Sequence, residues 1–521
     1  MPDNPLSKIK HVIVLMLENR SFDNLFGYLY DSQNEAPFDK PQRNQSFEGV
    51  SGKDLTNPIP AAFGGGVARV GECTDFTAPQ PNPNEKYADI YGQTFNVNPP
   101  PEVIPNPAEP PNMQGFVANY ASVIEAYNKK HSSSPTPAQP GDLMRCFRPK
   151  SLPVISGLAN AYAVCDHWFS SVPTETFPNR SFVFAGTSNG YVDNEWKTGK
   201  LPWDIHVLIN KRETIFNLLE DAGVPWRIYH GGSLLTSFAF LLHEQLHQFA
   251  THNPARRRFF EMDQFWKDIE SADALPSYSF IEPRYFSSPL FGPQNDFHPD
   301  YLPIHPEGLS NVEQGELLIY QVYEAIRKSP AWDSTLFVIT FDEHGGCYDH
   351  VPPPAAVSPD DVVIAPSEPG GSGFLFNRLG VRVPAVLISP YIEQGTVCHT
   401  TFDHTSIIKT VINCFGLKDA QGNPATMLER EKAATDLSEV LTLTEPRTDT
   451  PEITPLLQPH KESLLEKSLD VIRHDILGLA AHRVANFFGE HLDYSKIETT
   501  HHLAALLEKK SVEILARTHR S

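Results

Sequence analysis

The sequence predicts an α/β protein, with a mainly parallel central sheet and helices on both of its faces. The prediction rests first on continuous apolar runs rich in β-branched residues, a pattern typical of strands buried on both faces. These runs alternate with segments of helical periodicity, which is the order of elements that builds a parallel sheet. The chain is also long enough for one large core, since 40% of its 521 residues are hydrophobic.

The clearest strands are expected at 11–17 (HVIVLML), 334–341 (STLFVITF) and 383–388 (VPAVLI). Each run is apolar almost throughout, so we expect these three strands to be buried on both faces. Weaker strand candidates are 224–229 and 277–281.

Helices are expected where apolar residues recur with a period near 3.6. These segments alternate with the strands along the chain, as a layered α/β structure requires. They are 21–30, 152–163, 214–222, 234–249, 312–328 and 405–414.

Residues 1–445 are predicted to form one large domain, and within it 37–112, rich in Pro, Asn and Gly, reads as a loop-rich insertion or cap. Residues 446–521 are predicted to be a linker followed by a C-terminal helical segment with an apolar face. That face could dock on the core, mediate a homo-oligomer contact or adsorb to lipid, so membrane contact is expected to be peripheral at most.

The charge balance argues against a nucleic-acid partner. The formal net charge is −21 and the sequence pI is near 5.4, so there is no basic footprint for a polyphosphate. The sequence also has no run of eighteen apolar residues and no signal-peptide h-region. We therefore expect a soluble protein, either cytoplasmic or exported without a leader.

Two of the best predicted strands end in neighbouring polar ligands, namely Glu18-Asn19 and Asp342-Glu343. Ligands of parallel sheets gather at the carboxyl ends of the strands, and these oxygen donors suit a divalent cation. Adjacent carboxylates at a buried strand end repel each other and need a cation or a proton. The structural alternatives are a capped strand-to-helix turn for the first pair and a solvated acidic turn for the second.

A third motif combines Thr176, Asn179 and Arg180 in a loop fixed by two prolines. A hydroxyl can be activated by metal coordination, and an arginine can hold phosphate oxygens with two hydrogen bonds. The alternative is a rigid proline-rich loop without a chemical role.

Together these motifs resemble the bacterial, fungal and plant phosphoesterase family, which includes phosphatidylcholine-preferring phospholipases C and the acid phosphatase A group. The resemblance covers about residues 9–417 and is carried by Glu-Asn-Arg-Ser-Phe-Asp at 18–23, Thr-x-Pro-Asn-Arg at 176–180 and Asp-Glu-x-x-Gly-x-x-Asp-His-Val at 342–351. It implies a three-layer α/β/α fold like that of alkaline phosphatase.

The resemblance also implies roles for these residues. Thr176 would be the nucleophile and would lie beside one or more divalent metal ions (Mg, Ca, Mn or Zn), while Asn179 and Arg180 would bind substrate. The implied metal ligands are Glu18, Asn19, Asp342, Glu343 and Thr176.

Two histidines are implied to contact the phosphoryl group and assist the leaving group, with His350 placed ahead of His298. The chain departs from the family pattern at 82–85, where Asn-Pro-Asn-Glu stands in place of Asp-Pro-Gly-His. One phosphate-contacting histidine is therefore expected to be absent.

The sequence thus predicts a metal-dependent hydrolase of phosphate esters that works through a phosphothreonine intermediate. The expected activity is that of a phospholipase C, releasing diacylglycerol and a phosphorylated head group from phosphatidylcholine-like lipids. The alternative is an acid phosphatase acting on small soluble phosphomonoesters. A more remote alternative is a non-catalytic phosphate- or lipid-binding protein that keeps the fold.

Overall fold

The computed structural model describes most of the chain. The described residues are 4–197, 205–207, 210–251, 253–287, 292–299, 310–368, 371–449 and 451–457.

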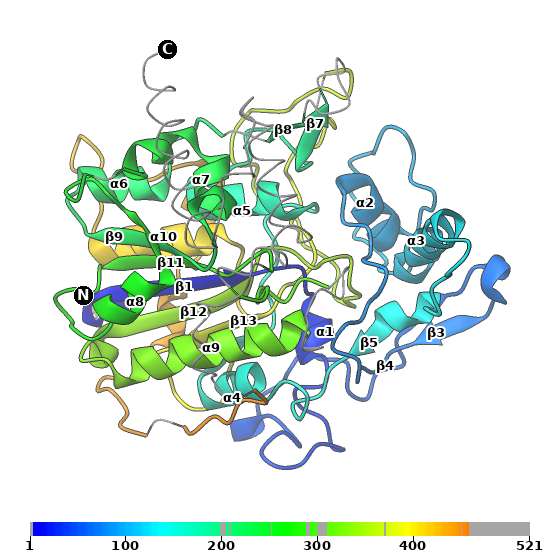
Figure 1. The fold of residues 1–521 in the computed structure, drawn as a ribbon, viewed down its shortest axis with the longest axis horizontal. Helices are drawn as coiled ribbons and strands as arrows, with labels where there is room; N and C mark the ends of the chain where they lie inside the picture. Colours follow the sequence, from blue (N-terminus) through cyan, green and yellow to red (C-terminus); the bar gives the residue numbers. More distant parts are fainter. Residues whose placement is uncertain are drawn as a thin grey trace, which may run out of the picture.

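An eight-stranded sheet forms the centre of the molecule (Figure 1). All neighbouring strands in it run parallel, except that β13 is antiparallel to both β12 and β6. The mainly parallel α/β class predicted from the sequence is therefore confirmed. In spatial order the strands are β10 (Phe259–Glu261), β9 (Trp226–His230), β11 (Tyr278–Glu282), β1 (His11–Leu17), β12 (Thr335–Phe341), β13 (Ala385–Ile388), β6 (Ala163–Cys165) and β14 (Thr396–Cys398).

The two strands that the sequence predicts most clearly lie side by side at the centre of this sheet. Every residue of β1 and β12 is buried, as their uninterrupted apolar runs predict. They pair in parallel with Leu17 opposite Phe341. The residues that follow, Glu18 and Asp342, therefore leave the sheet next to each other at its carboxyl edge.

Helices cover both faces of the sheet. Helices α4 and α9 lie on one side of the strands in Figure 1, and α5, α6 and α7 on the other, where α10 packs against α5. Helix α8 packs against β9 and β10. The bounds are α1 (Phe22–Phe26), α2 (Tyr87–Phe95), α3 (Phe116–Lys130), α4 (Pro153–Ala161), α5 (Thr176–Ala185), α6 (Ile215–Asp221), α7 (Phe238–Leu242), α8 (Met262–Asp268), α9 (Asn311–Lys328), α10 (Thr405–Phe415) and α11 (Glu429–Ala433).

A lobe with its own small core lies beyond the carboxyl ends of β1 and β12 (Figure 1). It contains α2 and α3, which pack through apolar side chains such as Ile90, Phe116 and Tyr120. Short two-stranded sheets accompany the main sheet; their strands are β2 (Thr56–Pro58), β3 (Val67–Arg69), β4 (Gly71–Glu72), β5 (Arg145–Cys146), β7 (Glu195–Lys197) and β8 (Ile205–Val207).

Several sequence expectations need correction. The expected helix 234–249 is broken into α7 and two 3-10 turns, because His243 after α7 is extended rather than helical. The expected helix 21–30 is only the short α1. The region 37–112 is more ordered than loops alone, since it holds α2 and three short strands.

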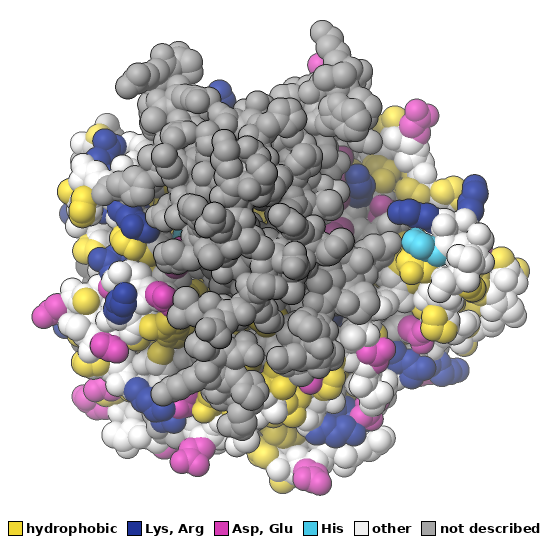
Figure 2. All heavy atoms as spheres, viewed as in Figure 1, with side chains coloured by type: hydrophobic (Ala, Val, Ile, Leu, Met, Phe, Trp, Pro, Cys, Tyr) yellow, Lys and Arg dark blue, Asp and Glu magenta, His cyan; other side chains and the backbone are white. Residues whose placement is uncertain are grey.

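The predicted C-terminal helical segment lies largely outside the described residues, which end at 457. None of the described helices combines the length and apolar character that crossing a lipid bilayer requires. On the face shown in Figure 2, acidic and basic side chains are interspersed over the described surface.

Candidate functional site

The carboxyl ends of β1 and β12 bring four of the five predicted metal ligands together. The backbone N–H of Asn19 donates to Oδ1 of Asp342 at 3.2 Å, and that of Arg20 donates to the carbonyl of Glu343 at 3.1 Å. The side chains of Glu18, Asn19, Asp342 and Glu343 are all buried. Two pairs separated by more than 300 residues in sequence therefore form one cluster.

The backbone of this cluster is unusually tight. Asn19 adopts the left-handed conformation with φ 58°, which non-glycine residues visit rarely and which is common at functional sites. Gly345 packs directly against it, since a Cβ atom there would lie 2.2 Å from the carbonyl oxygen of Asn19. Glycine at 345 is thus required for the two strand ends to meet.

Helix α5, which begins with the predicted nucleophile, contacts the same cluster through Arg180. Thr176 is the first residue of α5, and Arg180 lies one turn further on the same face. The guanidinium of Arg180 is fully buried, with Nε 3.0 Å from Asp342 Oδ2 and Nη2 3.4 Å from Glu18 Oε1. This pairing brings α5, one turn from its first residue, against the carboxylate cluster.

The side chain of Asn179 stabilises the loop that precedes α5. Its Oδ1 accepts the N–H of Val172 at 3.1 Å, and its Nδ2 donates to the carbonyls of Val172, Thr174 and Glu175. The side chain is fully buried. These contacts make Asn179 a support of the loop that precedes Thr176.

The buried carboxylates of this cluster need a cation to offset their negative charge. Burial, and then the charges of Asp342 and Asp296, raise the pKa of Glu18 well above its ordinary value. Burial, and then Asp342, raise the pKa of Glu343 in the same way. Among the described residues, three buried acceptors here form no hydrogen bond, and of them only Glu18 Oε1 has an ion-pair contact, with Arg180; the three are Glu18 Oε1, Asn19 Oδ1 and Glu343 Oε1. Oxygen donors in this arrangement fit a divalent metal ion.

A further acidic residue, Glu85, joins the cluster from the lobe. Its Oε2 accepts a hydrogen bond of 2.5 Å from Asn19 Nδ2, and its carboxyl group is close enough to that of Glu343 for each to shift the pKa of the other. Burial, and then Glu343, raise the pKa of Glu85 well above its ordinary value. Glycine at 346 allows the segment 82–85 to approach the cluster, because a Cβ atom at 346 would lie 2.6 Å from Pro83 Cβ.

The sequence analysis did not assign Glu85 a role. The available signal was its position at the end of Asn-Pro-Asn-Glu, where relatives have Asp-Pro-Gly-His. The structure places the glutamate side chain beside the predicted metal ligands.

His298 lies on a loop that is tied to the same strand end. The carbonyl of Asp296 accepts the N–H of Glu18 at 2.7 Å, and Asp296 Oδ1 accepts the N–H of His298 at 2.9 Å. His298 is also close enough to Glu85 to lower the pKa of that carboxyl electrostatically, although burial dominates. The structure thus brings His298 to the rim of the cluster.

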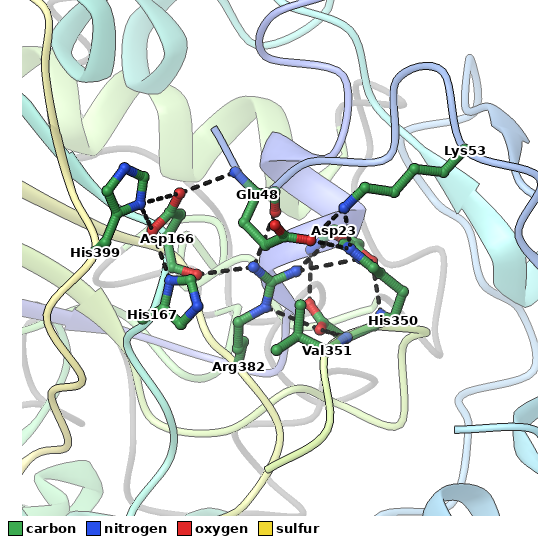
Figure 3. Close-up of polar contacts among 10 residues, drawn as sticks. Asp23, Glu48, Lys53, Asp166, His167, His350, Val351, Arg382 and His399 are labelled. Atoms are coloured by element: carbon green, nitrogen blue, oxygen red, sulfur yellow. Dashed lines mark hydrogen bonds and ion pairs between the residues drawn. The ribbon is translucent and has the colours of Figure 1, made fainter. Parts of the chain in front are cut away.

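His350 lies in a different network, shown in Figure 3. Its Nδ1 is 2.7 Å from Asp23 Oδ2 and its Nε2 is 2.9 Å from Glu48 Oε1. Burial lowers the pKa of His350, but the Asp23 carboxylate outweighs this and leaves the pKa above its ordinary value. Within the described part of the chain, no hydrogen bond of His350 reaches Thr176 or the carboxylate cluster.

The fully buried Arg382 holds this second network together. Its Nε donates to Asp349 Oδ1 and its Nη2 to Asp23 Oδ1, both at 2.9 Å. The buried guanidinium offsets one of the two carboxylate charges, and His350, whose pKa is raised, can offset the other, which favours a structural role for this network.

Most of the chain matches one protein family. The Phosphoesterase family matches residues 9–418. Non-specific phospholipase C3 of Arabidopsis thaliana is 34% identical over 463 residues, covering 87% of this chain and 77% of the relative. Non-specific phospholipase C4 of the same plant is 34% identical over 519 residues, covering 94% and 83%. Phospholipase C B of Mycobacterium tuberculosis is 28% identical over 442 residues, covering 79% and 74%.

Solved structures overlap this chain only in part. A protein in the alkaline phosphatase superfamily from Vibrio parahaemolyticus is 14% identical with a TM-score of 0.29, covering 51% of this chain and 60% of that one. A phosphonate monoester hydrolase from Silicibacter pomeroyi is 14% identical with a TM-score of 0.27, covering 58% and 73%.

Proposed function

The chain belongs to the phosphoesterase family, whose members are hydrolases acting on phosphate esters, and we propose that its own activity is that of a phospholipase C. The substrates are phosphatidylcholine-like phospholipids, and the products are diacylglycerol and the phosphorylated head group. Support comes from the plant relatives named non-specific phospholipase C, which are similar over most of both chains.

Thr176 is the nucleophile in this proposal. The observation that carries it is the link from Arg180 to Asp342 and Glu18, because this link holds α5, one turn from its first residue, against the carboxylate cluster. Thr176 Oγ1 attacks phosphorus in line, and the bond from phosphorus to the diacylglycerol oxygen breaks. Water then cleaves the phosphothreonine ester, which releases the phosphorylated head group and restores the hydroxyl.

One or more divalent metal ions belong to this site in the proposal, and Mg, Ca, Mn and Zn are all compatible with its oxygen donors. When bound, such an ion lowers the pKa of a nearby hydroxyl and offsets negative charge on phosphate oxygens. The residues that hold it are Glu18, Asn19, Asp342, Glu343 and Thr176, and we add Glu85 to this set because it contacts Asn19 and Glu343.

His298 protonates the departing alcohol in this proposal, in preference to His350. His298 is close to Glu85 at the rim of the cluster, whereas His350 is engaged by Asp23 and Glu48. Asn179 and Arg180 act as positioning residues, since their polar groups hold the loop and the strand ends rather than pointing to free space.

Four carboxyl groups, those of Glu18, Glu85, Asp342 and Glu343, gather around one guanidinium, which favours occupation of the site by divalent metal. The choice of a diester over a monoester rests on the relatives named phospholipase C. In keeping with the predicted domain organisation, we propose that residues 1–445 form the catalytic unit, with 37–112 as a cap over the site.

A side-by-side rate measurement tests this proposal. The purified protein is assayed with p-nitrophenylphosphorylcholine, a diester, and p-nitrophenyl phosphate, a monoester, each with and without chelator. We expect chelator-sensitive cleavage that favours the diester. Cleavage of the monoester alone would replace the proposal by an acid phosphatase, and failure to cleave either substrate with metal supplied would point to a binding protein.

A further inference from the structure

A second cluster of metal-ligating side chains lies away from the site described above. Asp166, His167 and His399 each offer one ligand atom, and these atoms all lie within 4.8 Å of one another. In Figure 3 they gather on the opposite side of Arg382 from His350.

The fold brings these residues together at the edge of the central sheet. Strands β6 and β14 are parallel neighbours with Cys165 opposite Cys398, so Asp166 and His399 follow the two strands at the same carboxyl edge. The N–H of Asp166 donates to the carbonyl of Cys398 at 3.1 Å, and the N–H of Phe402 donates to the carbonyl of His167 at 3.0 Å. Backbone hydrogen bonds therefore fix both sides of the cluster in advance of any ligand.

The side chains converge on one carboxylate. Asp166 is fully buried, and its Oδ1 lies 2.7 Å from His167 Nδ1 and 2.9 Å from His399 Nδ1. The imidazoles are partly open to solvent, with exposed side-chain fractions of 29% and 44%. Zinc binds imidazole nitrogen and carboxylate oxygen at about 2.0–2.2 Å, and rings that are partly exposed can reorient around such an ion.

Neighbouring groups hydrogen-bond to these donor side chains and orient them. Asp166 Oδ2 accepts the N–H of Glu48 at 2.9 Å and lies 3.0 Å from His399 Nδ1, while Oδ1 faces both rings. His399 Nε2 lies 3.0 Å from Ser46 Oγ, so that ring can donate Nε2–H to the hydroxyl and present the Nδ1 lone pair to a cation.

We propose that Asp166, His167 and His399 form a second metal site, which binds a divalent ion of the zinc type and is separate from the oxygen-rich site at Glu18 and Asp342. Two imidazole nitrogens and one carboxylate oxygen are the donors that zinc and neighbouring transition metals prefer, whereas Mg and Ca prefer oxygen alone. Three protein donors with exposed rings leave positions for water.

The site has a structural consequence for the cap region. Ser46 and Glu48 belong to the segment that contacts the cluster, and Arg382 Nη1 donates to the backbone carbonyls of both Glu48 and Asp166 at 2.9 and 2.8 Å. A metal at Asp166 therefore fixes the segment whose Glu48 side chain holds His350.

Zinc content of the full chain tests this inference. The protein is stripped with chelator, dialysed against Zn²⁺ and analysed for bound zinc, as wild type and as His399→Ala, His167→Ala, Glu343→Gln and the control His131→Ala. His131 lies at the end of α3 and contacts Tyr127, apart from both clusters. Both ring variants change partly exposed side chains, so they are expected to fold.

We expect His399→Ala and His167→Ala each to lose about one equivalent of zinc, while His131→Ala keeps the wild-type content. Glu343→Gln keeps the equivalent that the two histidine variants lose. Addition of Co²⁺ to the stripped protein should give visible d–d absorption that weakens in His399→Ala. The inference is overturned if both histidine variants bind as much zinc as wild type, in which case the rings serve only as hydrogen-bond donors to Asp166.

Discussion

Nε of Arg180 lies 3.0 Å from Oδ2 of Asp342, and both side chains are fully buried. Arg180 belongs to the helix that begins with Thr176, while Asp342 follows the central strand β12. One buried ion pair therefore sets the position of the proposed nucleophile relative to the proposed metal ligands.

Removing the guanidinium should destabilise the protein as well as inactivate it. Arg180→Met leaves the Asp342 and Glu18 carboxylates without their buried partner, which typically costs about 3–5 kcal/mol. Urea unfolding measures this loss. The matched control is Arg69→Met, whose ion pair with Asp54 is exposed and contributes less than about 1 kcal/mol. Equal losses in the two variants would contradict the role given to Arg180.

Glu85 should contribute to metal affinity. Glu85→Gln keeps the size and the hydrogen-bonding capacity towards Asn19 but removes one negative charge from the cluster. We expect the affinity for divalent metal, measured by isothermal titration calorimetry, to fall about 10–100-fold. Glu102→Gln changes an exposed carboxylate in the same region and should leave the affinity unchanged. An unchanged affinity in Glu85→Gln would remove Glu85 from the proposed ligand set.

The stabilisation by metal should grow as the pH rises. The pKa values of Glu18 and Glu343 are raised in the fold, so the metal-free folded protein binds more protons than the unfolded chain above about pH 4.3. The stability of the metal-free protein therefore falls as the pH rises through these raised pKa values, whereas bound metal removes the penalty.

Thermal unfolding with and without metal, between pH 5 and 8, measures this effect. We expect the difference in Tm between the two forms to widen with pH and to shrink in Glu343→Gln. A difference that narrows with rising pH would show that the carboxylates are not desolvated as the fold indicates.

Gly346 should tolerate no side chain. It has φ 66°, and a Cβ atom would lie 2.6 Å from Pro83 Cβ and 2.7 Å from the carbonyl oxygen of Asn84. Gly346→Ala should therefore cost about 1–3 kcal/mol through steric conflict, in addition to backbone strain. Gly64→Ala is the control, because φ there is 94° with no atom within 4 Å of the new Cβ, so only the strain remains. Denaturant unfolding of both variants separates the two contributions.

The parts of the fold that the sequence predicts well are those with strong local patterns. The strand 11–17 has the same bounds in the structure, and 334–341 differs by one residue, because continuous apolar runs leave few alternatives. The expected helix 312–328 corresponds to α9, whose start is fixed by a capping box between Ser310 and Glu313. The expected helix 234–249 is not continuous because tertiary contacts override its periodicity, with the N–H of Asn210 donating to the carbonyl of Leu242 at 2.6 Å.

The parts of the site that the sequence did not predict depend on contacts between residues that are far apart in sequence. Glu85 meets Asn19 across 66 residues, and His399 meets Asp166 across 233 residues. Strands β6 and β14 that carry the latter pair have only three residues each, too few for a recognisable period. His350 is the opposite case. The family resemblance implied that His350 contacts the phosphoryl group, whereas in the structure its ring lies against Asp23.

The most direct test of the proposed chemistry compares Thr176→Ala with Thr176→Ser on p-nitrophenylphosphorylcholine in the presence of metal. The serine variant keeps a hydroxyl at the start of α5, whereas the alanine variant keeps the fold and loses the nucleophile. The account predicts that Thr176→Ala has no measurable turnover, with an unchanged circular dichroism spectrum, while Thr176→Ser retains activity. Substantial diester hydrolysis by Thr176→Ala would contradict the threonine nucleophile.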